Sequence, residues 1–138
     1  EDIAEAARVA QAADFISALP GGYDAPVAQG GANFSGGQKQ RVAIARALVK
    51  RPPLYIFDDS FSALDFRTDA ALRAALPSYT GGSTVIIVAQ RISTIMGADR
   101  IVVLEDGRLA GMGTHRELLE SCALYREIAE SQLSGEEL

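Results

Sequence analysis

The stretch Leu54-Tyr55-Ile56-Phe57-Asp58-Asp59 decides the fold expected for this chain. Four apolar residues are followed directly by two acids, a pattern typical of a buried parallel strand whose carboxyl end meets a site. A second apolar run, Thr84–Ala89, is rich in β-branched residues and directly precedes Gln90. Both runs are apolar on both faces, so we expect the strands to be covered on both sides. Parallel sheets bind ligands at the carboxyl ends of their strands, where Asp58, Asp59 and Gln90 fall.

Helical patterns alternate with these two strands. Proline and paired glycines interrupt a helix, so Leu19–Tyr23, Arg51-Pro52-Pro53 and Pro77 are expected to end the first three helices. The predicted helices cover residues 1–15, about 36–50, 66–76, 114–119 and 125–133, and the fourth begins with a capping box of Thr114 and Glu117. Two further strands, 101–104 and 108–110, flank a tight turn. This alternation predicts an α/β domain with a mostly parallel sheet.

The composition limits what the chain can be. Its 138 residues are 48% hydrophobic and 22% charged, which suits a single globular unit with a core. The net charge is −5 and the basic residues are scattered, so we expect no nucleic-acid partner. The single Cys122 excludes an internal disulfide and fits a reducing compartment, and no apolar run approaches the roughly 18 residues of a membrane span. Because the helical pattern starts directly at Glu1, we expect the back part of a larger protein.

Residues Ser35-Gly36-Gly37-Gln38 have the properties of a phosphate-binding loop at the start of a helix. Adjacent glycines let the backbone approach an anion closely, and the unpaired N–H groups and the helix dipole favour a phosphate there. The hydroxyl of Ser35 adds a donor. A Ser-Gly-Gly tripeptide alone is most often a flexible turn, but the helical run Gln38–Leu48 that follows makes this pattern specific.

On these residues, the chain resembles the ATPase domains of ABC transporters. Phe34–Leu48 resembles the family's signature motif and helix, and Leu54–Asp58 resembles its Walker B strand. Ser62-Ala63-Leu64-Asp65 resembles the D-loop, and Thr84–Arg91 resembles the strand with the switch loop. Leu19–Tyr23 and Gly113-Thr114-His115 with Glu117-Leu118-Leu119 are similar to the exporter subgroup. The resemblance implies a P-loop NTPase-type sheet with flanking helices. In it, residues 1 to about 52 belong to the helical signature subdomain, and about 53 to 138 carry the other motifs and the C-terminal helices.

The resemblance also implies a role for each site residue. Ser35, Gly36, Gly37 and Gln38 would contact ATP held by a second ATPase domain, because the family's domains pair head to tail. Asp58 would hold Mg²⁺ through water, and the D-loop residues Ser62, Ala63 and Asp65 would lie at the seam between the two domains. The implied partners are this second ATPase domain and the transmembrane domains of an exporter, at the cytoplasmic face of the cell membrane.

Two residues depart from the family pattern. Asp59 stands where the family has a glutamate that polarises the attacking water, and aspartate sets its carboxylate back by one C–C bond, about 1.5 Å. Misplacement by about 1 Å can cost on the order of a hundredfold in rate, so Asp59 is either a slow catalytic base or a carboxylate kept for charge balance near Mg²⁺. Gln90 replaces a histidine, and an amide can neither become cationic nor relay a proton. We expect a hydrolysis-deficient site.

The family's nucleotide cradle is missing, since no Gly-x-x-x-x-Gly-Lys-Ser/Thr occurs in the 138 residues. We therefore expect that the chain by itself does not hold ATP tightly. The resemblance places the missing Walker A strand between the strands at Thr84–Ala89 and Ile101–Leu104. Either a preceding segment of chain or a partner copy would fill this gap in the sheet.

Three functions remain open. The leading one is the degenerate half of a heterodimeric exporter, and the others are a slow homodimeric exporter and a soluble ABC-type regulator. Residues 25–31 align with the exporter loop that touches the membrane domains, or form a plain surface loop, because Gln29 replaces the usual glutamate. His115, inside the capping box, is expected to be structural.

Overall fold

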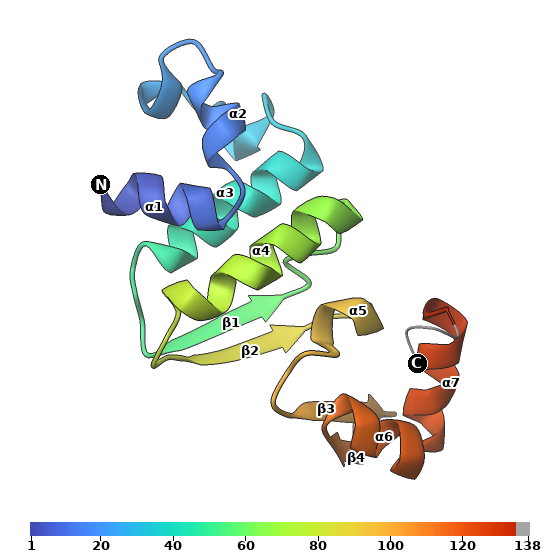
Figure 1. Cartoon of the computed structure of the whole chain (residues 1–138). Helices are drawn as coiled ribbons and strands as arrows, with labels where there is room; N and C mark the ends of the chain where they lie inside the picture. Colours follow the sequence, from blue (N-terminus) through green and yellow to red (C-terminus); the bar gives the residue numbers. More distant parts are fainter. Residues whose placement is uncertain (135–138) are drawn as a thin grey trace. The chain divides into compact units, whose positions relative to one another are not determined.

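A computed structural model describes residues 1–134 of the chain (Figure 1). The chain divides into two compact units, Glu1–Val88 and a second unit beginning at Ala89. Each unit contains its own two-stranded sheet. The two units are therefore described one at a time.

The first unit is an α/β arrangement, which confirms the fold class expected from the sequence. Strands β1 (Leu54–Asp58) and β2 (Thr84–Val88) pair in parallel, with Asp58 opposite Val88. Figure 1 shows the helices of this unit stacked on one side of the strand pair. These helices are α1 (Asp2–Val9), α2 (Ala13–Ser17), α3 (Gly36–Leu48) and α4 (Phe66–Tyr79), with two short 3₁₀ turns at Gly22–Asp24 and Gln29–Gly31.

One core holds this unit together. It combines buried residues of α1, α3, β1 and α4, among them Ala6, Leu48, Phe57 and Leu72. This core contains residues from both sides of position 52. The subdomain boundary expected there stays a prediction. Tyr55 and Phe57, on the helix-facing side of β1, stack with ring centroids 6.0 Å apart.

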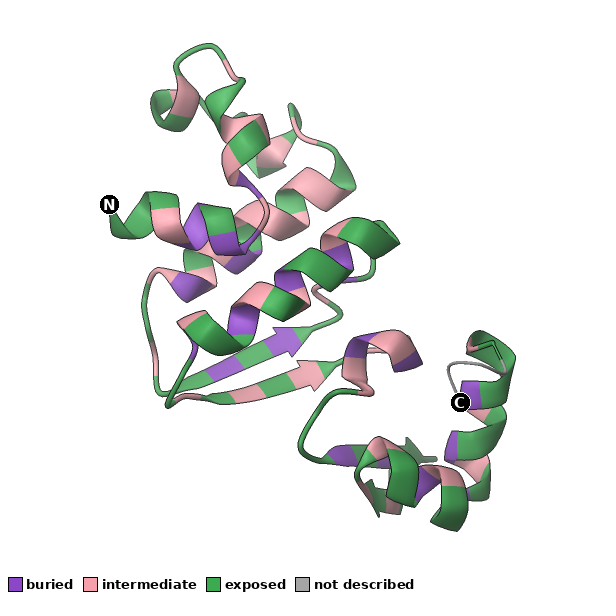
Figure 2. Ribbon diagram, in the orientation of Figure 1, coloured by how far each residue is buried: buried purple, intermediate pink, exposed green. Residues whose placement is uncertain are grey.

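The expectation that both strands are covered on both sides was wrong. Burial alternates along β1, where Tyr55 and Phe57 are buried while Ile56 is 63% exposed (Figure 2). Leu54, Ile86 and Val88 are exposed as well. The physical reason is that the helices of this unit cover only one face of the strand pair. We call the open face, made of Leu54, Ile56, Ile86 and Val88, the apolar sheet face.

Two helix predictions also need correction. The helix predicted over residues 1–15 is interrupted after α1, because Gln11 adopts a left-handed backbone (φ 58°) and α2 starts only at Ala13. The carbonyl oxygen of Gln11 then accepts a hydrogen bond from Arg41 Nη1 at 2.7 Å. No glycine or proline marks this break in the sequence.

Pro77 does not end the helix that it was expected to end. It lies inside α4, in its last turn, where a missing N–H forfeits a single hydrogen bond. The helix ends at Tyr79, and the C-cap residue Thr80 donates from both its backbone N–H and its Oγ1 to the carbonyl oxygen of Leu76 at 2.9 Å. These two hydrogen bonds to one carbonyl oxygen close the helix two residues beyond the proline.

Between residues 89 and 134, the second unit contains an antiparallel hairpin and three helices. Strands β3 (Ile101–Glu105) and β4 (Arg108–Gly113) are joined by Asp106 and Gly107, whose positive φ angles of 49° and 74° fit the predicted tight turn. The helices are α5 (Ile92–Ile95), α6 (His115–Ser121) and α7 (Ala123–Gln132). Among the helices of residues 1–134, none is long and apolar enough to pass through a bilayer.

The start of α6 has the predicted capping box. Thr114 N donates to the Glu117 carboxylate at 2.8 Å, and this bond with that from the Thr114 hydroxyl holds the pKa of Glu117 below its ordinary value. His115 Nδ1 lies 2.8 Å from the Tyr125 hydroxyl of α7. His115 therefore joins two helices, which agrees with the structural role expected for it.

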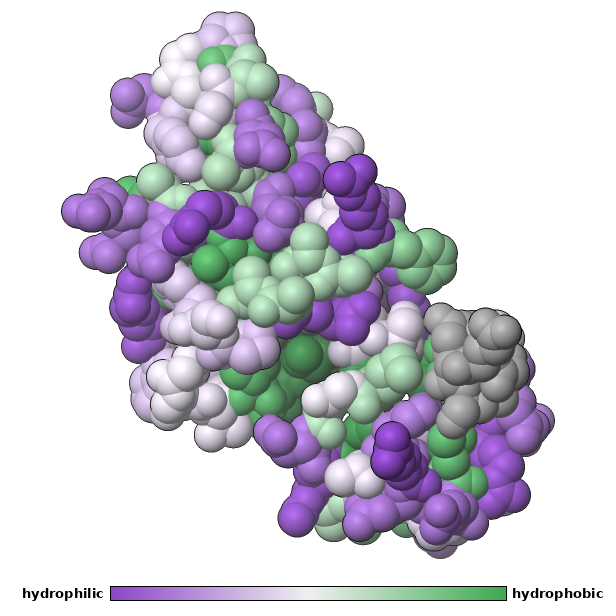
Figure 3. Space-filling model, viewed as in Figure 1, coloured by the Kyte–Doolittle hydropathy of each residue, from purple (hydrophilic) through white to green (hydrophobic). Residues whose placement is uncertain are grey.

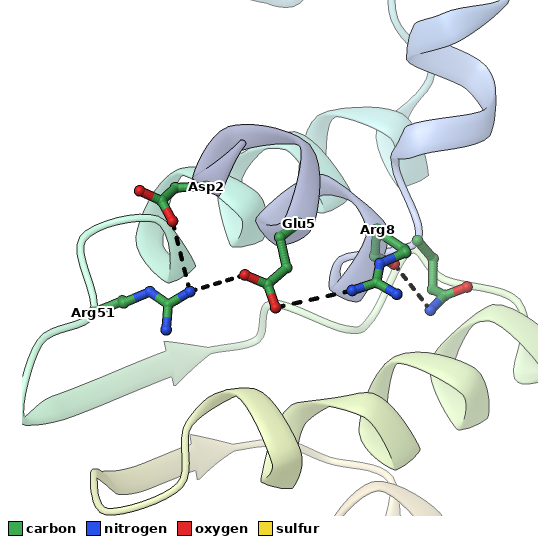
Figure 4. A network of polar contacts seen from close by, with 5 residues as sticks. Asp2, Glu5, Arg8 and Arg51 are labelled. Carbon is green, nitrogen blue, oxygen red and sulfur yellow. Dashed lines mark hydrogen bonds and ion pairs between the residues drawn. The ribbon is translucent and has the colours of Figure 1, made fainter.

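The surface of the first unit carries a small ion-pair network on α1 (Figure 4). Arg51 Nη2 lies 2.9 Å from a Glu5 carboxylate oxygen and 3.8 Å from Asp2, and Arg8 completes the chain of charges. All four side chains are substantially exposed, so each pair contributes at most about 1 kcal/mol. In Figure 3 hydrophilic atoms gather around α1, whereas paler apolar atoms run along α4, where Ala70, Ala71 and Ala74 are exposed.

Candidate functional site

The Ser-Gly-Gly loop begins α3 through a capping box that the sequence reading did not identify. Ser35 is the N-cap residue, and its Oγ accepts a hydrogen bond from Gln38 N at 3.2 Å. In return, Gln38 Oε1 accepts from Ser35 N at 2.9 Å. The two polar side chains at the ends of the tetrapeptide Ser35–Gln38 therefore fix its backbone.

This capping leaves the two glycines available. A helix has unpaired N–H groups in its first turn, and the capping box uses those of Ser35 and Gln38. The N–H groups of Gly36 and Gly37, at the first and second helical positions, have no partner within the helix by its geometry. Gly36 is exposed and Gly37 half-buried, so a phosphate oxygen can reach this end of α3.

Aromatic and cationic contacts hold the loop against α2. Phe34, just before the loop, packs edge-on against Phe15 with ring centroids 5.9 Å apart. The Arg41 guanidinium lies 4.8 Å from the centre of the Phe15 ring and donates to the carbonyl oxygen of Gly37 at 3.3 Å. Arg41 also donates to the carbonyl oxygen of Gln11, so the same guanidinium connects the helix break at Gln11 to Gly37.

The strand-end acids lie where the sequence placed them. Asp58 is the last residue of β1, and its side chain is exposed. Asp59 continues the ladder, since its N–H donates to the carbonyl oxygen of Val88 at 3.0 Å, but its φ of 47° turns the chain sharply out of the strand. Its carboxylate accepts a hydrogen bond from Ser62 Oγ at 3.1 Å. This carboxylate is therefore held by its own loop.

The donor set at this strand end suits one type of metal site. Within residues 1–134 no three His, Cys, Asp or Glu side chains are grouped closely enough to hold a metal by themselves. Mg²⁺ is usually held by only one or two carboxylates, with phosphates and water completing the coordination. Asp58 can supply one such carboxylate, so the site fits magnesium carried by a nucleotide rather than a protein-only cage.

The D-loop residues lie between β1 and α4. Asp65 is the N-cap of α4, and its carboxylate accepts from Thr68 N at 3.0 Å and from Thr68 Oγ1 at 2.7 Å. These hydrogen bonds hold the pKa of Asp65 below its ordinary value. Ser62 and Ala63 are bound to Gln40 of α3, a residue that the sequence reading passed over. The structure thus brings the Ser-Gly-Gly loop, Asp59 and the D-loop together within one unit.

Gln90 belongs to the second unit, and its side chain is exposed. Its carbonyl oxygen accepts a hydrogen bond from Gln132 Nε2 at 2.9 Å, and Gln132 Oε1 accepts from Ile92 N at 2.8 Å. Gln132 was not identified from the sequence. Nothing in the sequence around it points to this contact, because the bonds join residues 40 and 42 positions apart.

Comparison with known proteins places these features in a family. The family model described as "ABC transporter" matches residues 1–62. An "Uncharacterized ABC transporter ATP-binding protein" of Mycobacterium tuberculosis is 50% identical over 132 residues, covering 96% of this chain and 22% of that protein. An "ATP-dependent lipid A-core flippase" of Chromobacterium violaceum is 48% identical over 134 residues, covering 97% of this chain and 23% of that protein.

A solved structure is similar in fold as well as in sequence. It is the "Structure of a bacterial Atm1-family ABC exporter with ATP bound", which matches with a TM-score of 0.91 and 46% identity. The match covers 96% of this chain and 24% of that one. The chain therefore spans less than a quarter of the length of each of these relatives.

Proposed function

We propose a function for this chain from one premise: it is a portion of an ABC transporter ATPase domain of the exporter type. In the whole transporter, this portion supplies its signature loop, Ser35–Gln38, to ATP held by a second ATPase domain. At its own ATP site it contributes Asp59 and Gln90, which weaken hydrolysis. The partner is then a different chain with a stronger site, as in a heterodimeric exporter.

The capped signature loop is the observation that carries this proposal. Ser35 and Gln38 hold each other, and the Gly36 and Gly37 N–H groups are left at the positive end of α3. A γ-phosphate presented by a partner domain would accept hydrogen bonds from these two N–H groups, and the Ser35 hydroxyl can donate a further hydrogen bond to it. The loop needs no rearrangement of its backbone to do so, which favours binding.

The weakness of the chain's own site follows from two side chains. Asp59 is one methylene shorter than the glutamate usual in the family, and its carboxylate is already engaged by Ser62 Oγ at 3.1 Å. A carboxylate set back by about 1.5 Å is poorly placed to orient an attacking water. The exposed amide of Gln90 can donate a hydrogen bond to phosphate but cannot carry positive charge.

Magnesium and ATP are proposed as the cofactor and substrate of the assembled site. Mg²⁺ would supply charge neutralisation between the β- and γ-phosphates. Asp58 would hold it through water, which fits an exposed carboxylate at a strand end. The D-loop residues Ser62, Ala63 and Asp65 would face the second ATPase domain across the seam.

The membrane domains of the exporter are the second proposed partner. The loop at residues 25–31 is ordered by Asn33, whose side chain accepts from Ala28 N at 3.1 Å and donates to the carbonyl oxygen of Pro26 at 3.2 Å. Val27 projects from this loop with 62% exposure, as a docking side chain would. We therefore propose that the chain works at the cytoplasmic face of the cell membrane, with this loop against the transmembrane part.

The test is hydrolysis at this chain's site in the full-length transporter with its second ATPase domain, whose own hydrolytic carboxylate is disabled. Asp59→Glu, Gln90→His and the double variant should raise turnover, the double variant by on the order of a hundredfold. Asp99→Glu adds the same methylene at an exposed position outside the site and should change nothing. Brisk turnover by the unmodified site, or no gain in the double variant, would refute the proposal. If the unmodified transporter consisted of two copies of this chain and turned over ATP steadily, a slow homodimeric exporter would replace it.

A further inference from the structure

The side chain of Gln40 connects α3 to the loop that follows β1. Its Nε2 donates to the carbonyl oxygen of Asp59 at 3.2 Å and to Ser62 Oγ at 3.1 Å. Its Oε1 accepts a hydrogen bond from Ala63 N at 2.9 Å. One amide therefore makes three hydrogen bonds to a segment 19 to 23 residues away in the chain.

A close backbone approach accompanies this bridge. Gly37 lies three residues before Gln40, on the same face of α3. A Cβ added to Gly37 would lie 3.0 Å from the carbonyl oxygen of Ala63, which is tighter than a normal contact. The glycine of the signature loop is thus needed for contact with the chain's own D-loop, in addition to the space that it leaves for a phosphate.

The loop held by Gln40 also holds the carboxylate of the chain's own site. Ser62 Oγ, which accepts from Gln40 Nε2, has its single hydrogen within reach of both the carbonyl oxygen and the carboxylate of Asp59, each at 3.1 Å. The strained φ of 47° at Asp59 is kept by these contacts and by the bond to Val88. An unbroken set of hydrogen bonds therefore runs from α3 to the Asp59 side chain.

We propose that Gln40 is a positioning residue that joins the signature loop to the Asp59–Ala63 segment, so that the two move as one body. The inference rests on the proposed function, because it links the phosphate contact offered to the partner's ATP with the carboxylate at this chain's own site. A displacement of the signature loop at one ATP is then passed directly to Asp59 at the other.

The chemistry of an amide explains why glutamine is needed here. The bridge requires two donated hydrogen bonds and one accepted bond from the same side-chain end. Glutamate keeps the acceptor for Ala63 N but loses both donors, and lysine keeps donors but has no acceptor. Methionine keeps a similar length and loses all three bonds. Comparing the glutamate and methionine variants therefore separates the effect of the accepted hydrogen bond from that of the two donated ones.

The experiment uses the full-length transporter with its second ATPase domain and measures amide hydrogen exchange together with ATP turnover. Gln40→Met should raise exchange at the Ala63 amide about tenfold, whereas Gln40→Glu should keep that amide protected. Both variants should lower kcat about five- to tenfold with KM for ATP within about twofold, because bonds that set geometry are lost while the signature loop remains capped. Arg46→Gln, on an exposed part of α3, is the control and should match the unmodified protein.

A double-mutant cycle separates positioning from a general loss of structure. If Gln40 acts through Ser62, then Gln40→Met and Ser62→Ala together should lower kcat hardly more than the stronger single change. Strictly additive losses, or raised exchange spread along α3 to Ile44 and Leu48, would overturn the inference. So would wild-type exchange and kcat in Gln40→Met. The exchange readout does not depend on which site hydrolyses ATP, so failure of the proposed heterodimeric function would leave it intact and be seen separately in the Asp59→Glu experiment.

Discussion

The side-chain amide of Gln132 donates from Nε2 to the carbonyl oxygen of Gln90 at 2.9 Å, and its Oε1 accepts from Ile92 N at 2.8 Å. The last turn of α7 thereby binds the backbone on both sides of Arg91. Gln90 itself leaves its side chain exposed. The backbone on both sides of Arg91 is therefore held by α7, and the exposed amide of Gln90 is the group that we propose meets a phosphate.

The first prediction concerns this clamp. Gln132→Leu removes both bonds and should raise hydrogen exchange at the Ile92 amide, with a stability loss of about 1–2 kcal/mol from two lost hydrogen bonds. Gln132→Glu keeps the acceptor for Ile92 N and loses the donor to Gln90, so the Ile92 amide should stay protected. Hydrogen exchange and chemical denaturation measure the two effects.

Glu130→Gln on the same helix is the matched control, since Glu130 is exposed and lies two residues from the clamp. It should leave exchange at Ile92 unchanged. Equal exchange at Ile92 in the leucine and glutamate variants would contradict the assignment of Oε1 as its partner.

The second prediction separates the two glycines of the signature loop by their own environment. A Cβ at Gly36 would meet Ala63 Cβ at an ordinary 3.8 Å, whereas one at Gly37 would meet the Ala63 carbonyl oxygen at 3.0 Å. Gly36→Ala should therefore be neutral or slightly stabilising, because alanine is the better helix former. Gly37→Ala should lower stability by about 1–2 kcal/mol, since backbone of the D-loop must move.

Thermal denaturation of the ATPase domain containing this chain compares the two variants directly. Because both substitutions add the same methyl group one residue apart, Gly36→Ala serves as the control for helix propensity. Equal midpoints for the two variants would show that the D-loop yields without cost.

The parts that could be predicted from the sequence are those set by neighbouring residues. The apolar run ending in Asp58-Asp59 indicates a strand whatever lies around it, and β1 ends at Asp58. The turn at Asp106-Gly107 and the capping box at Thr114 and Glu117 depend on residues at most three positions apart, and both were confirmed. The helix start at Ser35–Gln38 is likewise local and was confirmed, whereas phosphate binding by this loop stays a prediction.

The parts that could not be predicted depend on distant residues. Gln40 and Gln132 look like ordinary polar helix residues, and only folding brings their partners within 2.8–3.2 Å. The break at Gln11 has no turn residue, and its carbonyl is bound by Arg41, 30 positions away. Ile56 is apolar and exposed because covering depends on which elements pack on each face, which the run of residues in β1 does not encode.

The third prediction concerns acid sensitivity. Hydrogen bonds from Thr68 hold the pKa of Asp65 below its ordinary value, and those from Thr114 do the same for Glu117. A carboxylate with a lowered folded-state pKa stabilises the fold above its unfolded-state pKa and loses this contribution as the pH falls through the folded-state pKa. The contribution is therefore full at neutral pH and fades below about pH 4.

Denaturation midpoints measured from pH 7 down to pH 2.5 check this sign. In Asp65→Asn and Glu117→Gln the capping groups no longer titrate, so the fall in stability with acid should be shallower than in the unmodified protein. Thr68→Val removes one of the donors to Asp65 and should flatten the curve in part. Unchanged slopes in all three variants would contradict the assigned cause.

The fourth prediction concerns the apolar sheet face of the first unit. Leu54, Ile56, Ile86 and Val88 are 45%, 63%, 45% and 52% exposed, although apolar area gains about 25 cal/mol per Å² on burial. Such a face on its own favours association. The 138-residue chain in isolation should therefore bind a hydrophobic dye and self-associate, and Ile56→Thr with Ile86→Thr should reduce both effects while keeping β-branched side chains in the strands.

Phe57→Thr is the matched contrast, because Phe57 is 2% exposed on the other face of β1 and its loss should unfold the unit rather than make it soluble. Sedimentation velocity with circular dichroism on the same samples separates the outcomes, and a monomeric, dye-silent and folded wild-type chain would show that this face is not adhesive.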